Sequence, residues 1–215
     1  MTGDTSPHRV RDDDLLARVA DGDRQAFAEL FRRCRPAVYR FALHMTGSVA
    51  TADDVVQDVF VIVMRDAARY QSGRAEAAAW LCGIARNCVR QRFEADRRLT
   101  GLDAANGREP ATEWGGPADP LAGLLRDEQL DTLRKAVGAL PLPYRETLVL
   151  CDLQELSYEA AAVALDCPVG TVRSRLHRAR AMLAVRLTAL CAEAEPALDL
   201  SHTRLAEAGA KGCLP

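Results

Sequence analysis

Hydrophobic side chains recur along most of the chain at intervals of three and four residues, the spacing that puts them on one side of an α-helix. In the first half, this spacing predicts four helices over residues 12–20, 24–46, 52–70 and 79–94. Thr51 can cap the third helix, and the rhythm of the second continues through Pro36, which can kink or interrupt it. Few runs alternate with a period of two residues, so the pattern favours an all-α fold.

The periodicity disappears between Arg97 and Gly123, where glycine and proline are frequent. This composition is typical of a linker. A segment of this length is too long for an ordinary loop inside one compact domain, so it predicts two domains. Residues 1–11 are expected to be disordered, and neither Trp114 in the linker nor the acidic, alanine-rich tail 193–215 has a role that the sequence explains.

Beyond the linker, helical spacing returns over residues 124–140, and Pro143 suits the start of a helix over 144–153. Residues 156–183 then predict two helices joined by a tight turn, extending to about residue 192. Ser157 can cap the first helix of this hairpin. Pro168 cannot continue that helix, yet its fixed φ suits the start of the second.

The second helix of the hairpin has an apolar side and a basic side. Val172, Leu176, Ala179 and Leu183 form the apolar stripe, and five arginines but no acidic residue lie between Thr171 and Arg186. A merely soluble surface would normally mix acids with the arginines. The basic side therefore suits the major groove of DNA, where arginine reaches guanine edges and phosphates. The alternative is an ordinary helical hairpin with a solvated basic face.

Two helices of the first half carry polar faces that permit alternative interpretations. On the predicted helix 52–70, an acidic face is either a solubility feature or a docking surface for a basic partner helix; its members are Asp54, Gln57, Asp58, Val61 and Arg65. The helix 79–94 begins with Trp80 and is basic along its length. An aromatic beside cations suits single-stranded nucleic acid, although a tryptophan at that position is more often part of a core.

The chain of 215 residues has 28 basic and 30 acidic residues, and its net charge of −2 conceals acid-rich early and arginine-rich late segments. Its seven cysteines are scattered without a C-x-x-C motif, which argues against a zinc site or a disulfide scaffold. Cys34, Cys82, Cys151 and Cys167 are expected to be small buried hydrophobes. The sequence has no signal-peptide h-region and no apolar run of about 20 residues, so a cytoplasmic location is expected.

We find no Ser/His/Asp grouping, no phosphate-cradling glycine loop and no paired carboxylates that would indicate catalysis. The sequence therefore predicts a protein that is not an enzyme, with no catalytic residues, no metal site and no cofactor.

Four segments together resemble the extracytoplasmic-function (ECF) members, or group IV, of the bacterial sigma-70 family. These segments are DDVVQDVF, WLCGIARN, LSYEAAAVAL and GTVRSRLHRAR, and the resemblance covers roughly residues 13–95 and 127–190. It implies an all-α factor of two small domains, sigma2-like at 12–96 and sigma4-like with a helix-turn-helix at 124–192, joined by the flexible linker 97–123. Such a factor binds core RNA polymerase through its β and β′ subunits and directs it to promoter DNA.

The resemblance also implies a role for each polar face. Polymerase binding would fall to Asp54, Gln57, Asp58 and Val61. Recognition and melting of the minus-ten element would fall to Trp80, Arg86, Asn87 and Arg90, beside the loop 71–78. Reading of the minus-thirty-five element would fall to Thr171, Arg173, Ser174, Arg175, His177 and Arg178.

The resemblance further suggests a cognate anti-sigma factor, no direct membrane insertion, and a cytoplasmic location at the nucleoid. The alternative hypothesis is a stand-alone helix-turn-helix transcriptional regulator with an N-terminal sensory domain. This alternative would assign no function to the acidic helix or to the basic segment that begins with Trp80. An enzyme of RNA or nucleotide metabolism is disfavoured by the lack of catalytic groups.

Overall fold

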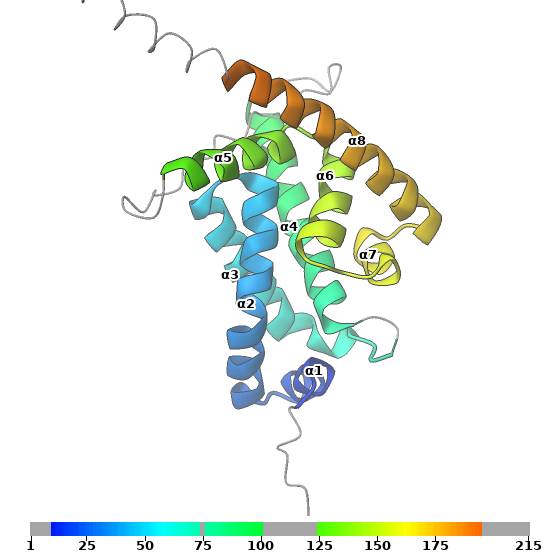
Figure 1. Cartoon of the computed structure of the whole chain (residues 1–215). Helices are drawn as coiled ribbons and strands as arrows, with labels where there is room; N and C mark the ends of the chain where they lie inside the picture. Colours follow the sequence, from blue (N-terminus) through cyan, green and yellow to red (C-terminus); the bar gives the residue numbers. More distant parts are fainter. Residues whose placement is uncertain (1–9, 74–75, 101–123, 195–215) are drawn as a thin grey trace, which may run out of the picture.

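The computed structural model describes residues 10–73, 76–100 and 124–194, and these residues form a bundle of helices (Figure 1). A short 3₁₀ turn, η1 (Ala67–Arg69), follows α3, and a wider π turn, η3 (Val149–Leu153), follows α6. The helices are α1 (Asp12–Ala20), α2 (Arg24–Thr46), α3 (Val49–Asp66), α4 (Ala77–Thr100), α5 (Leu124–Gly138), α6 (Leu142–Leu148), α7 (Tyr158–Leu165) and α8 (Val169–Ala194). The all-α prediction is confirmed.

The N-terminal half, α1 to α4, packs the apolar stripes that the sequence pattern predicts. Asp23 caps α2 by accepting hydrogen bonds from the backbone amides of Gln25 and Ala26 at 2.8 and 3.0 Å. The helix then continues through Pro36, which is exposed and does not end it. Its aromatic side chains meet Phe60 of α3, with ring centroids 4.7 Å apart for Phe31 and 6.2 Å apart for Phe27.

Two helices of this half, α3 and α4, have boundaries that differ from the prediction at both ends. Helix α3 begins at Val49, and its N-cap is Ser48, whose hydroxyl accepts the Thr51 amide at 3.2 Å. The predicted cap, Thr51, is therefore wrong: it lies inside the first turn of the helix. Gly47 separates the end of α2 at Thr46 from the cap Ser48, and its φ of 68° is a left-handed conformation that glycine adopts without strain.

Helix α4 is longer than the predicted 79–94 at both ends, running from Ala77 to Thr100. Residues 97–100, which the sequence pattern places in the linker, are thus helical. The rest of the predicted linker, with Trp114, lies outside the described residues, as do residues 1–9, 74–75 of the predicted 71–78 loop, and the tail beyond Ala194.

In the C-terminal half, the predicted helix 144–153 is two elements, because α6 ends at Leu148 and the chain continues as the π turn η3. Pro141 is the N-cap of α6. The hairpin α7–α8 follows the prediction more closely: the Ser157 hydroxyl accepts the Ala160 amide at 3.1 Å, and Pro168 immediately precedes α8. Asp166 makes the turn between them in the left-handed region, with a φ of 50°.

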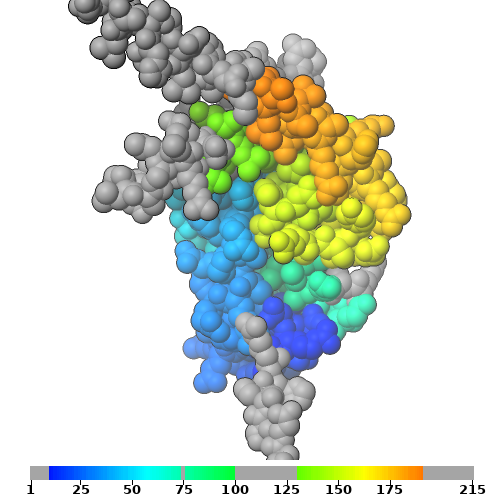
Figure 2. All heavy atoms as spheres, viewed as in Figure 1, coloured from blue at the N-terminus to red at the C-terminus, as the bar shows by residue number. Residues whose placement is uncertain are grey.

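The two halves are packed against each other. Helix α4 contacts α2 and α3 on one side and α7 on the other, and α5 contacts α2 (Figure 1). One continuous hydrophobic core includes Phe41 and Leu81 of the first half and Leu148 and Leu176 of the second. In the space-filling view, α6 to α8 cover one flank of the first half without a break (Figure 2). None of the described helices combines the length and the apolar character that crossing a membrane requires.

The cysteines of the core follow the prediction in part. Cys34 and Cys82 are buried, as is Cys88, whereas Cys151 and Cys167 are half-buried. Burial in apolar surroundings raises the pKa of the Cys34 thiol to about 12 and that of Cys82 to about 12. The thiolate is the reactive form, so these groups are expected to be inert in the folded protein.

We therefore expect Cys34 and Cys82 to resist iodoacetamide at pH 8, because almost none of either thiol is ionised below its raised pKa. Both should be labelled after denaturation in urea, as mass spectrometry of the tryptic peptides would show. Rapid labelling of either cysteine in the native chain would contradict its burial.

Ser48→Ala should lower the free energy of unfolding by about 1 kcal/mol, because it removes the side-chain acceptor at the start of α3. Thr51→Ala is the matched control and should change the free energy by less than about 0.5 kcal/mol. Urea denaturation followed by circular dichroism measures both. A larger loss of unfolding free energy for the Thr51 variant than for the Ser48 variant would show that Thr51 is the cap, as the sequence pattern predicts.

Candidate nucleic-acid interfaces

The basic face of α8 is presented to solvent by a buried apolar stripe. Val172, Leu176 and Ala179 are buried against the rest of the C-terminal half and fix the rotation of the helix. Of the six residues predicted to read a duplex, two are half-buried, Thr171 and Arg175, and four are exposed: Arg173, Ser174, His177 and Arg178. The helix can therefore offer several cations to DNA on one side.

Neighbouring groups fix two side chains of α8. The Arg173 guanidinium carbon lies 5.8 Å from the ring centroid of Tyr158 on α7, a cation–π arrangement. Arg180 lies to one side and forms a forked pair with Asp152 of η3, at 2.7 and 3.0 Å. Arg180 is thus already neutralised by a carboxylate of the same half, which distinguishes it from Arg178.

The acidic face of α3 is also exposed. Asp54, Gln57 and Asp58 face solvent, and two apolar side chains lie among them, with Val61 55% exposed and Met64 57% exposed. Asp58 forms an ion pair with Arg92 of α4 at 2.6 Å. The face therefore combines carboxylates with exposed apolar area, which suits a partner surface that is both basic and apolar.

On α4, Trp80 is half-buried at the junction of three elements. Its ring centroid lies 5.5 Å from that of Tyr70, and the Tyr70 hydroxyl donates a hydrogen bond to the Asp13 carboxylate of α1. About two turns further along, Asn87 is exposed. In this conformation Trp80 contributes to packing, and Asn87 is open to solvent.

Two arginines of α4, Arg86 and Arg90, for which the resemblance predicts DNA contacts, face the other half of the molecule in this structure. Arg90 donates two hydrogen bonds to the Glu146 carboxylate of α6, at 2.6 and 2.9 Å. Arg86 Nε lies 3.1 Å from the same carboxylate. The Glu146 side chain is 0% exposed and that of Arg86 only 12%. The structure thus brings Arg86 and Arg90 together, but around a carboxylate of the same chain.

Arg145, next to Glu146, is a second buried charge between the halves. Its guanidinium donates to the carbonyl oxygen of Met45 on α2 at 2.9 Å and to that of Leu140 at 3.1 Å, and it also bonds Gly138. Neither Arg145 nor Glu146 belongs to a site that the sequence predicts. Their only signal is a charged pair within the apolar run of α6, which ordinary helix periodicity does not explain.

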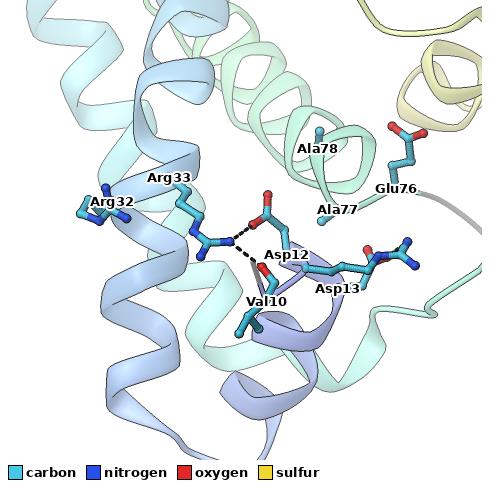
Figure 3. Close-up of a pocket in the computed structure, with 9 residues that line it drawn as sticks. Val10, Asp12, Asp13, Arg32, Arg33, Glu76, Ala77 and Ala78 are labelled. Carbon is cyan, nitrogen blue, oxygen red and sulfur yellow. Dashed lines mark hydrogen bonds and ion pairs between the residues drawn. The ribbon is translucent and has the colours of Figure 1, made fainter. Parts of the chain in front are cut away.

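A cavity of about 730 Å³ opens between α1, α2 and the start of α4 (Figure 3). Its charged side chains neutralise one another: Arg33 bonds Asp12 at 3.2 Å, and Arg11 bonds Asp13 at 2.9 Å. Arg33 also donates to the carbonyl oxygen of Val10 at 2.6 Å. Within the described part of the chain, no group of three His, Cys, Asp or Glu residues is placed to hold a metal ion.

Three faces are candidates for binding partners, and they are spatially distinct. The acidic and apolar face of α3 and the basic face of α8 are exposed. On the basic face of α4, Asn87 is exposed, whereas Arg86 and Arg90 are paired with Glu146 of α6. The first two faces can bind ligands in this conformation, and Arg86 and Arg90 can do so only after they leave Glu146.

Comparison with known families assigns both halves. Residues 30–99 match the model for Sigma-70 region 2, and residues 130–183 match the model for Sigma-70, region 4.

Similar proteins carry the same assignment. The ECF RNA polymerase sigma factor SigE of Mycolicibacterium smegmatis is 36% identical over 172 residues, which cover 76% of this chain and 63%, or less than two thirds, of that relative. The RNA polymerase sigma-H factor of Pseudomonas aeruginosa is 30% identical over 86% of this chain and 97% of its own length. Among solved structures, the sigma factor RpoE of Bartonella quintana, in complex with the anti-sigma factor NepR, has a TM-score of 0.61 at 27% identity, covering 75% of this chain and 96% of that one.

Proposed function

This chain belongs to the sigma-70 family, among its ECF RNA polymerase sigma factors, and on that premise we propose which of its surfaces carry out promoter-specific transcription initiation. Its function is to bind core RNA polymerase and direct it to promoters. The observation that supports the surface assignment best is the exposed cationic face of α8, seated on a buried apolar stripe.

We assign the minus-thirty-five element to α8. A helix seated by Val172 and Leu176 projects Arg173 and Arg178 outward, as a major-groove reader requires. Thr171, Ser174, Arg175 and His177 complete the surface. Arginine forks can read guanine edges, while the hydroxyl and imidazole groups can position the helix on phosphates.

We assign core polymerase to α3. Asp54 and Gln57 offer polar contacts, and the exposed side chain of Val61 offers apolar area to bury in an interface. Asp58 belongs to the same surface. Because it is paired with Arg92, it would have to give up this arginine in order to bind a cation of the polymerase. We expect the partner helices, on the β and β′ subunits, to be basic.

We assign the minus-ten element to α4, with Trp80, Arg86, Asn87 and Arg90. Cations beside an aromatic ring and an amide suit an unstacked strand. Extruding a base costs a few kcal/mol, so the protein must supply compensating contacts. Since Arg86 and Arg90 are paired with Glu146 in this conformation, this assignment requires them to leave it.

The remaining partners follow from the family. The Bartonella quintana relative is seen with an anti-sigma factor, which supports a cognate anti-sigma factor for this chain as well. We also place the chain in group IV, with its site of action in the cytoplasm at the nucleoid. The polymerase would perform the chemistry, so the chain itself would be no enzyme and would need no cofactor. The stand-alone regulator is not favoured, because both halves match one family of initiation factors.

Arg178→Ala should weaken binding of the chain to a minus-thirty-five duplex by roughly 1–3 kcal/mol, about 5- to 150-fold, if the arginine reads a base. Fluorescence anisotropy with a labelled duplex measures the affinity, once transcripts made with core polymerase have identified the promoter. Arg180→Ala is the matched control, because its guanidinium is already paired with Asp152. Equal losses for both variants would refute the assignment of the face.

Asp54→Lys should reduce capture of core polymerase by about tenfold or more, because it puts a like charge opposite a basic partner. Asp54 is a cleaner choice than Asp58, whose reversal would also break the pair with Arg92. Asp131→Lys, an exposed acid on α5, is the control. Size-exclusion chromatography with core polymerase gives the readout, and minus-thirty-five duplex binding should be unchanged in both variants. Unaltered capture by the Asp54 variant would remove α3 from the polymerase interface.

A further inference from the structure

We propose that a groove between α5 and the C-terminal part of α8 is the docking site of a segment of this same chain, residues 195–200. The sequence of this docking segment is EPALDL, and it follows directly on the last residue of α8. We call the site the α5–α8 groove. The proposal goes beyond the polymerase and promoter faces assigned above and does not depend on them.

The α5–α8 groove is lined by small apolar side chains and by two cations. Its volume is about 320 Å³, and it lies where α5 packs beside α8 (Figure 1). Three of its lining residues are alanines, whose short side chains leave room for a larger apolar group. The lining residues are Lys135, Ala136, Ala139, Arg186, Ala189 and Leu190.

The C-terminal part of α8 lacks the buried stripe that seats its N-terminal part. Ala179 is the last buried residue among those whose side chains the structure describes in this helix. Beyond it, Leu183, Leu187 and Leu190 are only half-buried, and Val185 is 71% exposed. An apolar segment in the α5–α8 groove would remove part of this surface from water, which is favourable.

The charges of the α5–α8 groove are complementary to those of the docking segment. Lys135 and Arg186 are exposed, and neither forms an ion pair with another described residue. The docking segment has two carboxylates, two leucines and no cation. These four residues are Glu195, Leu198, Asp199 and Leu200. The segment therefore offers leucines to the apolar lining and carboxylates to the two cations.

The docking segment begins close to the α5–α8 groove. Helix α8 ends at Ala194, about 6 Å along the axis from Leu190 and about 12 Å from Arg186. Pro196 disfavours a helical conformation of the residue before it, so the helix is not expected to continue through Glu195. Six extended residues span about 20 Å. The segment is therefore long enough to turn back along α8 and enter the groove.

The small size of the α5–α8 groove favours an occupant that is tethered to it. A stable interface between separate proteins involves about 20–30 residues on each side, far more than the described lining of this groove. A segment joined to α8 by a few residues has an effective concentration on the order of millimolar, so a weak contact is enough to hold it. These considerations select the chain's own segment over a second copy or another protein.

Photocross-linking in the full-length chain tests the proposal. Ala197→p-benzoylphenylalanine keeps both leucines of the docking segment, and irradiation should join position 197 to the tryptic peptide that contains Ala136 and Ala139. Ala210→p-benzoylphenylalanine is the matched control and should give at least about tenfold less of this product, because it lies outside the docking segment. Mass spectrometry of the digested chain measures both yields.

Two results of this experiment would overturn the proposal. One is a yield of the cross-link from position 197 that does not exceed the yield from position 210. The other is a cross-link that joins two different molecules, which a mixture of isotopically labelled and unlabelled chains would reveal. The second result would mean that the groove binds another copy of the chain.

Reversal of the groove charges tests whether the carboxylates direct the docking. Lys135→Glu combined with Arg186→Glu should lower the yield of the cross-link from position 197 at least about threefold, because like charges then face each other. Adding Glu195→Lys and Asp199→Lys to the same chain should restore the yield. Circular dichroism should show the same helicity in all variants. A yield that stays constant throughout, with the fold intact, would contradict docking by charge complementarity.

Discussion

A carboxylate that has no contact with water must be paired with a cation and hydrogen-bonded, and among the described residues the ion-pair partners of Glu146 are two arginines of the first half of the molecule. Its partners on α4 lie more than fifty residues earlier in the chain. The need to pair this carboxylate therefore fixes the position of α6, α7 and α8 on α4. The apolar contacts of the interface alone would define that position less sharply. Hydrophobic contacts bring the halves together, and the buried charges choose one arrangement among the possible ones.

Most helices could be predicted from the sequence, because each buries a stripe whose spacing is local. The predicted helix boundaries were wrong where the local sequence is compatible with two structures. Ser48 and Thr51 are both good caps, and only the left-handed turn at Gly47 decides for Ser48. Similarly, α6 and η3 share one apolar run, and the change from α to π geometry leaves no mark in hydrophobic spacing.

The faces of the candidate sites were predictable to different degrees. The apolar stripe of α8 decides which side of this helix faces the core. The exposed position of Arg178, on the opposite side, could therefore be predicted. The surroundings of Arg86 and Arg90 could not, because they depend on a contact between segments far apart in the chain. A basic residue on a helix indicates a need for negative charge, but not whether a nucleic acid or a glutamate of the same protein supplies it. Residue-level assignments from a family pattern describe the assembled complex, whereas this structure describes the chain alone.

The cation–π contact between Arg173 and Tyr158 has a consequence for selectivity. A long side chain that is already held against an aromatic ring has fewer rotamers to lose when it meets a ligand, so less of its binding energy is spent on ordering. The same restraint limits the directions in which the Arg173 guanidinium can point. It therefore also limits which base pairs the guanidinium can reach. On the proposed assignment of α8 to the minus-thirty-five element, a tyrosine on the neighbouring helix would thereby influence which promoters this protein prefers, without touching a base.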